Sequence, residues 1–150
     1  MKKFNDWFFA GIIAGLFGGI AHLLYNALLL AVGIQYKTFW HVMAGVFYGG
    51  KLTMMPSAQI HGMIDAIGLS VATGVLLSLT LFLTGKDYLY AKSITMSASG
   101  PYFVFLIIVS QGDKNSLIVP WVALFGYIVF NGILEGYLLN KICTYKTRIE

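Results

Sequence analysis

Four long apolar runs dominate this sequence and constrain its fold more than any other feature. They cover residues 7–33, 54–84, 88–111 and 117–139. One helical crossing of a bilayer needs about 17–25 consecutive apolar residues, and a helix satisfies its own backbone hydrogen bonds in lipid. Each run is long enough, so the sequence predicts an all-α membrane protein. We expect a bundle of four transmembrane helices in a single domain over residues 1–150.

The composition supports the same class. Of the 150 residues, 58% are hydrophobic and 11% are charged, and the mean hydropathy is +0.77. A soluble domain usually carries about 25% charged residues. A soluble core of this length could not bury so many large apolar side chains. The expected partner of the outer surface is therefore the lipid bilayer.

The ten basic residues flank the apolar runs, which predicts topology signals and no nucleic-acid partner. Seven fall on one side of the predicted membrane: Lys2, Lys3, Lys86, Lys92, Lys141, Lys146 and Arg148. Three fall on the other: Lys37, Lys51 and Lys114. This excess predicts a multi-pass protein with both termini in the cytoplasm. The first run is too long for a signal peptide and has no cleavage motif, so we expect it to remain as the first helix.

The connections between the runs are unequal. Residues 36–52 are rich in aromatic side chains but too short to cross, which predicts an interfacial or re-entrant helix between the first two spanning helices. His41, in this segment, is expected at the surface. Residues 85–87 and 112–115 are tight polar turns, so the helices that they join should be antiparallel neighbours.

Small residues predict where the helices pack, because transmembrane helices associate through close backbone approach. Whether these faces pack within one subunit or form a homo-oligomer or larger membrane complex is left open. The predicted packing glycines are Gly11, Gly15, Gly18, Gly19, Gly68, Gly100, Gly132 and Gly136.

Polar residues inside the apolar runs are the candidate functional residues. They are His22, Asn26, His61, Asp65, Asn131 and Glu135. In the second run, a stripe at spacings of three and four predicts the face turned toward other helices, and the opposite side predicts the lipid face. The stripe is Ala58, His61, Asp65, Gly68 and Ala72; the lipid face is Ile60, Met63, Ile64 and Ile67. If the helices are longer than the bilayer is thick, Asp65 and Glu135 lie at its interfaces instead.

Three functional hypotheses remain open. Intramembrane carboxylates and histidines are typical of routes for a proton, a cation or a small solute. Alternatively, the chain is a non-transporting subunit or scaffold that packs through its glycine faces, with His22 a packing histidine. As a third hypothesis, His22 and His61 ligate a haem, or bind a metal together with Asp65.

Catalytic motifs are missing from the sequence. It contains no HExxH and no G-x-S-x-G, and Cys143 is the only cysteine. We therefore expect no catalytic residue, and the sequence favours a protein that is not an enzyme and has neither a metal nor a cofactor.

The stretch DWFFAGIIAGLFGGI (6–20), followed by VFYGG (46–50), resembles uncharacterised small four-helix integral membrane proteins of Gram-positive bacteria. The resemblance is strongest over residues 6–50. It implies a bacterial cytoplasmic membrane. It implies no activity, so no functional residue is transferred from it.

Overall fold

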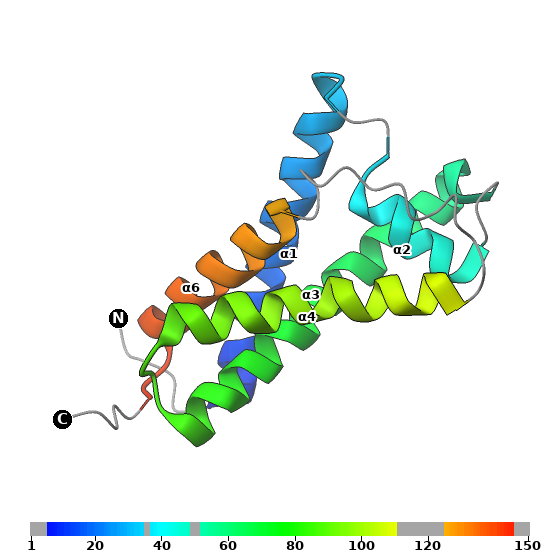
Figure 1. The fold of residues 1–150 in the computed structure, drawn as a ribbon. Coiled ribbons are helices and arrows are strands. Elements are labelled where there is room, and N and C mark those ends of the chain that lie inside the picture. The colour runs from blue at the N-terminus through cyan, green and yellow to red at the C-terminus, as the bar shows by residue number, and fades with distance from the viewer. Residues whose placement is uncertain (1–5, 35–36, 49–51, 111–124, 146–150) are drawn as a thin grey trace.

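The computed structural model describes residues 6–34, 37–48, 52–110 and 125–145. Of these residues 88% are helical and none lies in a strand, which confirms the prediction of an all-helical chain. Figure 1 shows the arrangement. The elements are α1 (Trp7–Ala31), α2 (Phe39–Tyr48), the 3₁₀ turn η1 (Leu52–Met54), α3 (Pro56–Thr84), α4 (Leu89–Ser110), the π-helix η3 (Ile128–Leu134) and α6 (Glu135–Ile142).

The first helix begins and ends where local chemistry favours it. The Asp6 carboxylate accepts hydrogen bonds from the backbone N–H groups of Phe8 (2.9 Å) and Phe9 (3.1 Å), which caps the start of α1. Beyond its end, Gly33 adopts a left-handed φ of +74°. The helix therefore covers most of the predicted span of residues 7–33.

Helices α3 and α4 are joined by the predicted turn at residues 85–87. Pro56 opens α3, where its missing N–H costs nothing, and Gly85 ends it with a φ of +79°. The Lys92 ammonium group donates to the Gly85 carbonyl and the Thr84 hydroxyl, both at 2.9 Å. The chain thus reverses, and α4 returns in the direction opposite to α3 (Figure 1). The second predicted turn, 112–115, lies outside the described residues.

Helix α1 packs most extensively against α3, and glycines set the approach. The two helices cross each other (Figure 1). A Cβ added to Gly11 would lie 2.7 Å from the Val75 Cα, and one added to Gly74 would lie 2.5 Å from the Gly11 carbonyl oxygen. A Cβ on Gly15 would overlap the Ser70 carbonyl. Backbone therefore meets backbone here, as expected where small residues line a membrane-helix interface.

The buried face of α3 differs from the predicted one by one or two positions. It carries a small residue at every fourth position: Ala58, Gly62, Ala66, Ser70, Gly74 and Ser78, all buried. Within the predicted stripe only Ala58 is buried. Ala72 is exposed, and nothing lies within 4 Å of a Cβ added to Gly68, so Gly68 does not pack against another described helix of the same chain. Ile60 and Ile64 face outward as predicted.

The outer surface is apolar, whereas the buried face of α1 is small or polar. Among the described residues, two helices, α1 and α3, are long and apolar enough to cross a membrane. Along α1 the buried residues include four glycines, His22 and Asn26. The large exposed side chains of the same helix are Phe8, Phe9, Leu16, Phe17, Ile20, Leu24, Leu28 and Leu30.

Helix α2 packs in the angle between α1 and α3, within the segment predicted to be interfacial. Gly62 of α3 approaches the Trp40 carbonyl so closely that a Cβ on it would overlap that oxygen. His41 is 5% exposed, so the prediction of a surface position for it is wrong. Its Nδ1 atom accepts hydrogen bonds from the Thr38 N–H (3.1 Å) and hydroxyl (2.6 Å). These bonds fold the side chain back against the start of α2.

The last helix is split between η3 and α6, and the first eight residues of its predicted span, 117–124, lie outside the described residues. The two elements run back along α1 and α4 (Figure 1). After α6, Tyr145 is hydrogen bonded to Ser78 at 2.5 Å, and Ser78 donates to the Trp7 carbonyl at 2.6 Å. This end of the bundle is therefore linked across α1, α3 and the segment after α6.

Candidate functional site

A buried polar cluster lies where η3 and the start of α6 meet α1 and α3. We define the cluster as Ser70 and Thr73 of α3 with Tyr127, Asn131 and Glu135. Asn131 and Glu135 come from the last helix, at the place where its geometry changes from π to α. A π-helical turn is rare and is frequent at functional sites, because it changes the direction of side chains relative to the rest of the helix.

Asn131 is oriented by a hydrogen bond to α3. Its Nδ2 atom donates to the Ser70 hydroxyl at 3.0 Å, and that hydroxyl donates to the Ala66 carbonyl at 3.0 Å. The amide nitrogen is therefore committed to α3. The Oδ1 atom is buried and makes no hydrogen bond within the described part of the chain.

Glu135 lies beside that free amide oxygen. Its side chain is completely buried, and neither carboxyl oxygen has a hydrogen-bond partner among the described residues. A Cβ added to Gly18 of α1 would lie 2.8 Å from Asn131 Oδ1 and 2.9 Å from Glu135 Oε1. The two oxygens therefore meet over Gly18, whose lack of a side chain leaves room for them.

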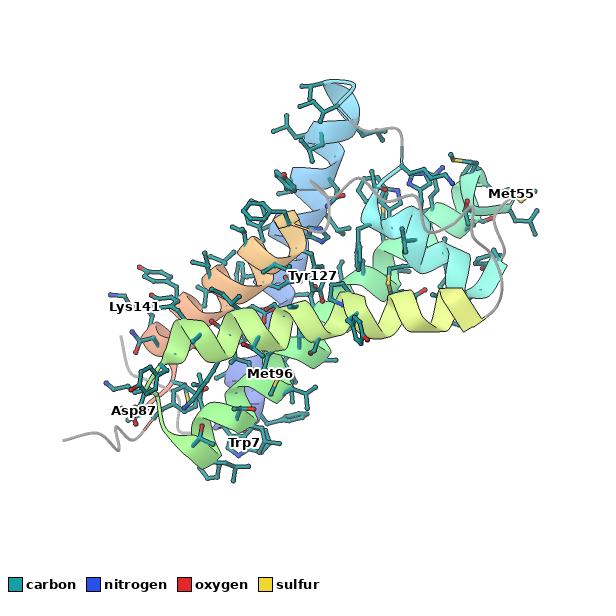
Figure 2. All side chains as sticks on the ribbon, in the orientation of Figure 1. Trp7, Met55, Asp87, Met96, Tyr127 and Lys141 are labelled. Atoms are coloured by element: carbon teal, nitrogen blue, oxygen red, sulfur yellow. The ribbon has the colours of Figure 1, made fainter. Side chains whose placement is uncertain are left out.

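Tyr127 closes the cluster toward α4. It is fully buried, and Figure 2 shows it at the centre of the bundle. A Cβ added to Gly100 of α4 would lie 3.4 Å from its hydroxyl oxygen and 3.2 Å from Thr73 Cγ2. The Tyr127 ring packs edge-on against His22 at 5.0 Å between centroids. The Tyr127 side chain thus lies beside both α4 and His22 of α1.

His22 and Asn26 form a second buried group that joins α1 to α2. Asn26 Nδ2 donates to His22 Nε2 at 2.6 Å and to the His22 carbonyl at 3.0 Å. Asn26 Oδ1 accepts the backbone N–H of Phe39 at 3.3 Å, which satisfies a free donor at the start of α2. The Phe39 ring covers His22 at 5.3 Å. This environment matches that of a packing histidine.

His61 and Asp65 lie at the edge of the molecule, away from this cluster. Their side chains are 40% and 22% exposed, and His61 Nε2 lies 3.7 Å from Asp65 Oδ2. His61 Nδ1 is hydrogen bonded to the Tyr48 hydroxyl at 3.0 Å, and the Phe47 ring lies 5.2 Å away. The pair therefore contacts α2. The prediction that it points into the bundle holds only in part.

The structure does not bring His22 and His61 together as haem ligands. His22 contacts Phe39, Tyr127 and Asn26, whereas His61 contacts residues at the other end of α2. In the described ranges no group of three or more His, Cys, Asp or Glu side chains could hold a metal ion. The haem and metal hypotheses therefore lack their ligand sets.

The remaining predicted glycines are buried inside the chain. A Cβ on Gly132 would lie 3.2 Å from the Ile94 Cα, and one on Gly136 would lie 2.7 Å from the Ser93 hydroxyl. Gly19 faces Ser70, with 3.0 Å from an added Cβ to the Ser70 Cβ. These faces are occupied by α3 and α4 of the same chain.

Three members of the cluster were not predicted from the sequence: Ser70, Thr73 and Tyr127. A signal for Ser70 was present, because it belongs to the small residues spaced four apart on α3. Tyr127 carried no such signal, since an aromatic residue in an apolar run is usually a lipid-facing or core side chain.

Comparison of the chain with protein-family models, characterised proteins and solved structures found no match.

Proposed function

We propose that this chain is a multi-pass protein of a bacterial cytoplasmic membrane, with four spanning helices and both termini in the cytoplasm. The distribution of side chains supports this proposal. Large apolar residues such as Phe17 and Leu24 are exposed, whereas His22, Asn26 and Glu135 are completely buried. A monomeric soluble protein rarely exposes so much contiguous apolar surface. A soluble protein has a polar surface and an apolar core. This chain has an apolar exterior and polar contacts between its helices, which fits a bilayer.

Within that membrane, the proposed activity is passage of a proton, a cation or a small solute through the buried polar cluster. The observation that supports it is Glu135, which is 0% exposed and whose two oxygens have no hydrogen-bond partner in the described structure. A charged side chain at the bilayer centre costs about 2.5–3.5 kcal/mol on insertion scales. A carboxyl group that only held the fold together would be expected to have a partner.

The test is a flux measurement with the purified protein in proteoliposomes. The wild type should dissipate a proton or alkali-cation gradient, and Glu135→Gln, which keeps the size of the side chain but removes its charge, should abolish this flux. Asp65→Asn is the matched control, because it makes the same chemical change on a partly exposed residue outside the cluster, and its flux should stay near that of the wild type. Equal flux in the wild type and in empty liposomes for protons, alkali cations and small solutes would contradict the proposal.

The alternative of a scaffold that binds larger partners through glycine faces has less support. Gly11 and Gly15 already contact α3, and Gly132 and Gly136 contact α4, within the same chain. Co-purification of a stoichiometric partner from native membranes, together with absent flux, is the result that would favour it.

A further inference from the structure

We infer that the buried polar cluster binds a monovalent alkali cation, with Glu135 and Asn131 as ligands and Gly18 as the residue against which both ligand oxygens pack. This inference rests on the proposed function in placing the cluster inside a membrane. It goes further by naming the ligand and the atoms that hold it.

The first step is the balance of hydrogen-bond donors and acceptors. Three buried oxygens in one place have no hydrogen bond within the described ranges: Asn131 Oδ1, Glu135 Oε1 and Glu135 Oε2. Two groups of the cluster could donate to them: the Asn131 amide nitrogen is committed to Ser70 at 3.0 Å, and the buried Tyr127 hydroxyl, which also has no hydrogen-bond partner among the described residues, carries a single proton. A buried acceptor without a donor is costly, and a group of them requires something positive. The donors of the cluster are therefore too few for its acceptors, and a cation would balance them.

The second step is charge. Of the four acidic residues in the described part of the chain, Glu135 alone is buried. One carboxylate and one monovalent ion form a neutral pair, whereas a divalent ion would leave a net charge in a low-dielectric interior. Divalent ions are normally bound by more than one carboxylate or by a cage of many oxygens. The charge of the cluster thus matches a monovalent ion.

The third step is the chemistry of the ligands. The amide oxygen of Asn131 and the carboxylate of Glu135 are hard oxygen donors, which suit hard cations and not the softer transition metals. The described residues also offer no group of three or more His, Cys, Asp or Glu that could hold a metal ion. A proton on Glu135 could satisfy Asn131 Oδ1 through one hydrogen bond, so protons should compete with the alkali ion for the same carboxylate.

The fourth step is orientation and access. The Ser70 hydroxyl accepts from Asn131 Nδ2 and so turns Oδ1 toward Glu135. Gly18 lies against both oxygens, with 2.8 and 2.9 Å from the position of an added Cβ to Asn131 Oδ1 and Glu135 Oε1. Ser70 is therefore a positioning residue. A methyl group on Gly18 would push the two ligands out of place.

The experiment measures binding and not transport. The midpoint of thermal unfolding of the full chain in detergent micelles is compared in LiCl, NaCl, KCl and choline chloride at equal ionic strength. A ligand that binds the folded state at about ten times its Kd should raise the midpoint by about 3 °C or more. We expect such a rise with at least one alkali ion relative to choline. It should be larger at alkaline than at mildly acidic pH, since protons compete.

Glu135→Gln and Gly18→Ala should each lose this alkali-specific rise, and Asp65→Asn should keep it. Equal midpoints of the wild type in all four salts would overturn the inference, and this result needs no variant to fold. A full rise in Glu135→Gln would overturn it as well. Alkali-dependent stabilisation without any flux would refute the proposed transport and leave the binding site intact. Proton flux without any alkali-dependent stabilisation would refute the alkali-binding site and leave the proposed transport intact.

Discussion

Two pairs of residues with the same spacing lie in opposite environments. Asn131 and Glu135 are four residues apart on the last helix, and both are 0% exposed. His61 and Asp65 are also four apart, on α3, and their side chains are 40% and 22% exposed. Spacing alone made the two pairs equivalent. The two pairs differ in the helix that packs opposite them, and this neighbour determines how far each pair is buried.

The difference teaches that the face of the helix on which a polar residue lies, and not the spacing within a pair, decides whether the residue is enclosed. Asn131 and Glu135 face Gly18, where α1 has no side chain to keep them out. His61 and Asp65 each precede the residues that face the neighbouring helices, Gly62 and Ala66. One step along a helix is a rotation of about 100°, which moves the pair from the interface to its edge.

The largest expected effect is a difference in stability between variants of a glycine on the inner face of the bundle and of one on its outer face. Gly15→Ala places a Cβ against the Ser70 carbonyl, where only backbone could move. We expect a loss of about 3 kcal/mol in the free energy of unfolding, at the upper end for overpacked positions. It is measured by denaturant titration in mixed micelles with tryptophan fluorescence.

Gly68→Ala is the matched control, since a Cβ there meets open space. Alanine favours a helix over glycine by about 1 kcal/mol, so this variant should be as stable as the wild type or more stable. Similar losses in both variants would mean that α3 does not present its buried face to α1 in this way.

The next effect compares the two polar pairs directly. Asn131→Ala removes the donor to Ser70 and leaves buried polar atoms without a partner, which should cost about 1–3 kcal/mol of unfolding free energy. His61→Ala removes a half-exposed contact with Asp65 and one hydrogen bond to Tyr48, and should cost less than about 1 kcal/mol. Both are measured in the same titration. The comparison fails if His61→Ala is the more damaging change.

Much of α1 could be predicted from sequence, and less of α3. On α1 the polar residues His22 and Asn26 lie in line with the glycines, so any reasonable choice of face included both. On α3 small residues occur on two adjacent stripes, and the sequence does not say which one meets α1. The strict spacing of four from Ala58 to Ser78 is the better guide, because it brings the same kind of small residue to one ridge of the helix.

The polar cluster itself could be predicted only in part. Asn131 and Glu135 were found as polar residues in an apolar run. Their contact with Gly18 depends on the π-helix η3, which changes the direction of side chains and has no signature in the apolar pattern. Tyr127 depends on the same turn, since it directly precedes η3.

A third carboxylate, that of Asp6, extends the comparison to a carboxylate that has hydrogen-bond partners. Asp6 is exposed and accepts two backbone N–H groups at the start of α1. Asp6→Ala should lower the unfolding free energy by about 1 kcal/mol, whereas Asp6→Asn, which can still cap, should lower it by less. Thermal unfolding in micelles gives the order of the three proteins. Equal loss in both variants would show that charge, and not capping, is what stabilises this end.

The smallest expected effect is a pH dependence at His41, the buried histidine of α2 outside the spanning helices. Burial, and then the charge of Lys37, lower the pKa of His41 below its usual 6.5. The unfolded chain therefore binds a proton more readily than the folded one, so this residue makes stability fall as the pH drops below about 6.5. Above that pH His41 is neutral in both the folded and the unfolded chain, so it adds no pH dependence to the stability.

His41→Gln should remove this contribution. Unfolding free energies of the wild type and the variant, measured from neutral to acidic pH, should converge or cross as the pH falls. A constant difference across that range would show that His41 does not resist protonation.

The central claim is that Glu135 is completely enclosed by the bundle while Asp65 is partly exposed at its edge, and chemical modification tests it most directly. The folded protein in micelles is treated with a water-soluble carbodiimide and an amine, and the modified carboxyl groups are located by peptide mass spectrometry. The account predicts that Asp65 is modified and that Glu135 is modified only after the protein is unfolded. Modification of Glu135 in the folded protein at the rate of Asp65 would contradict the account.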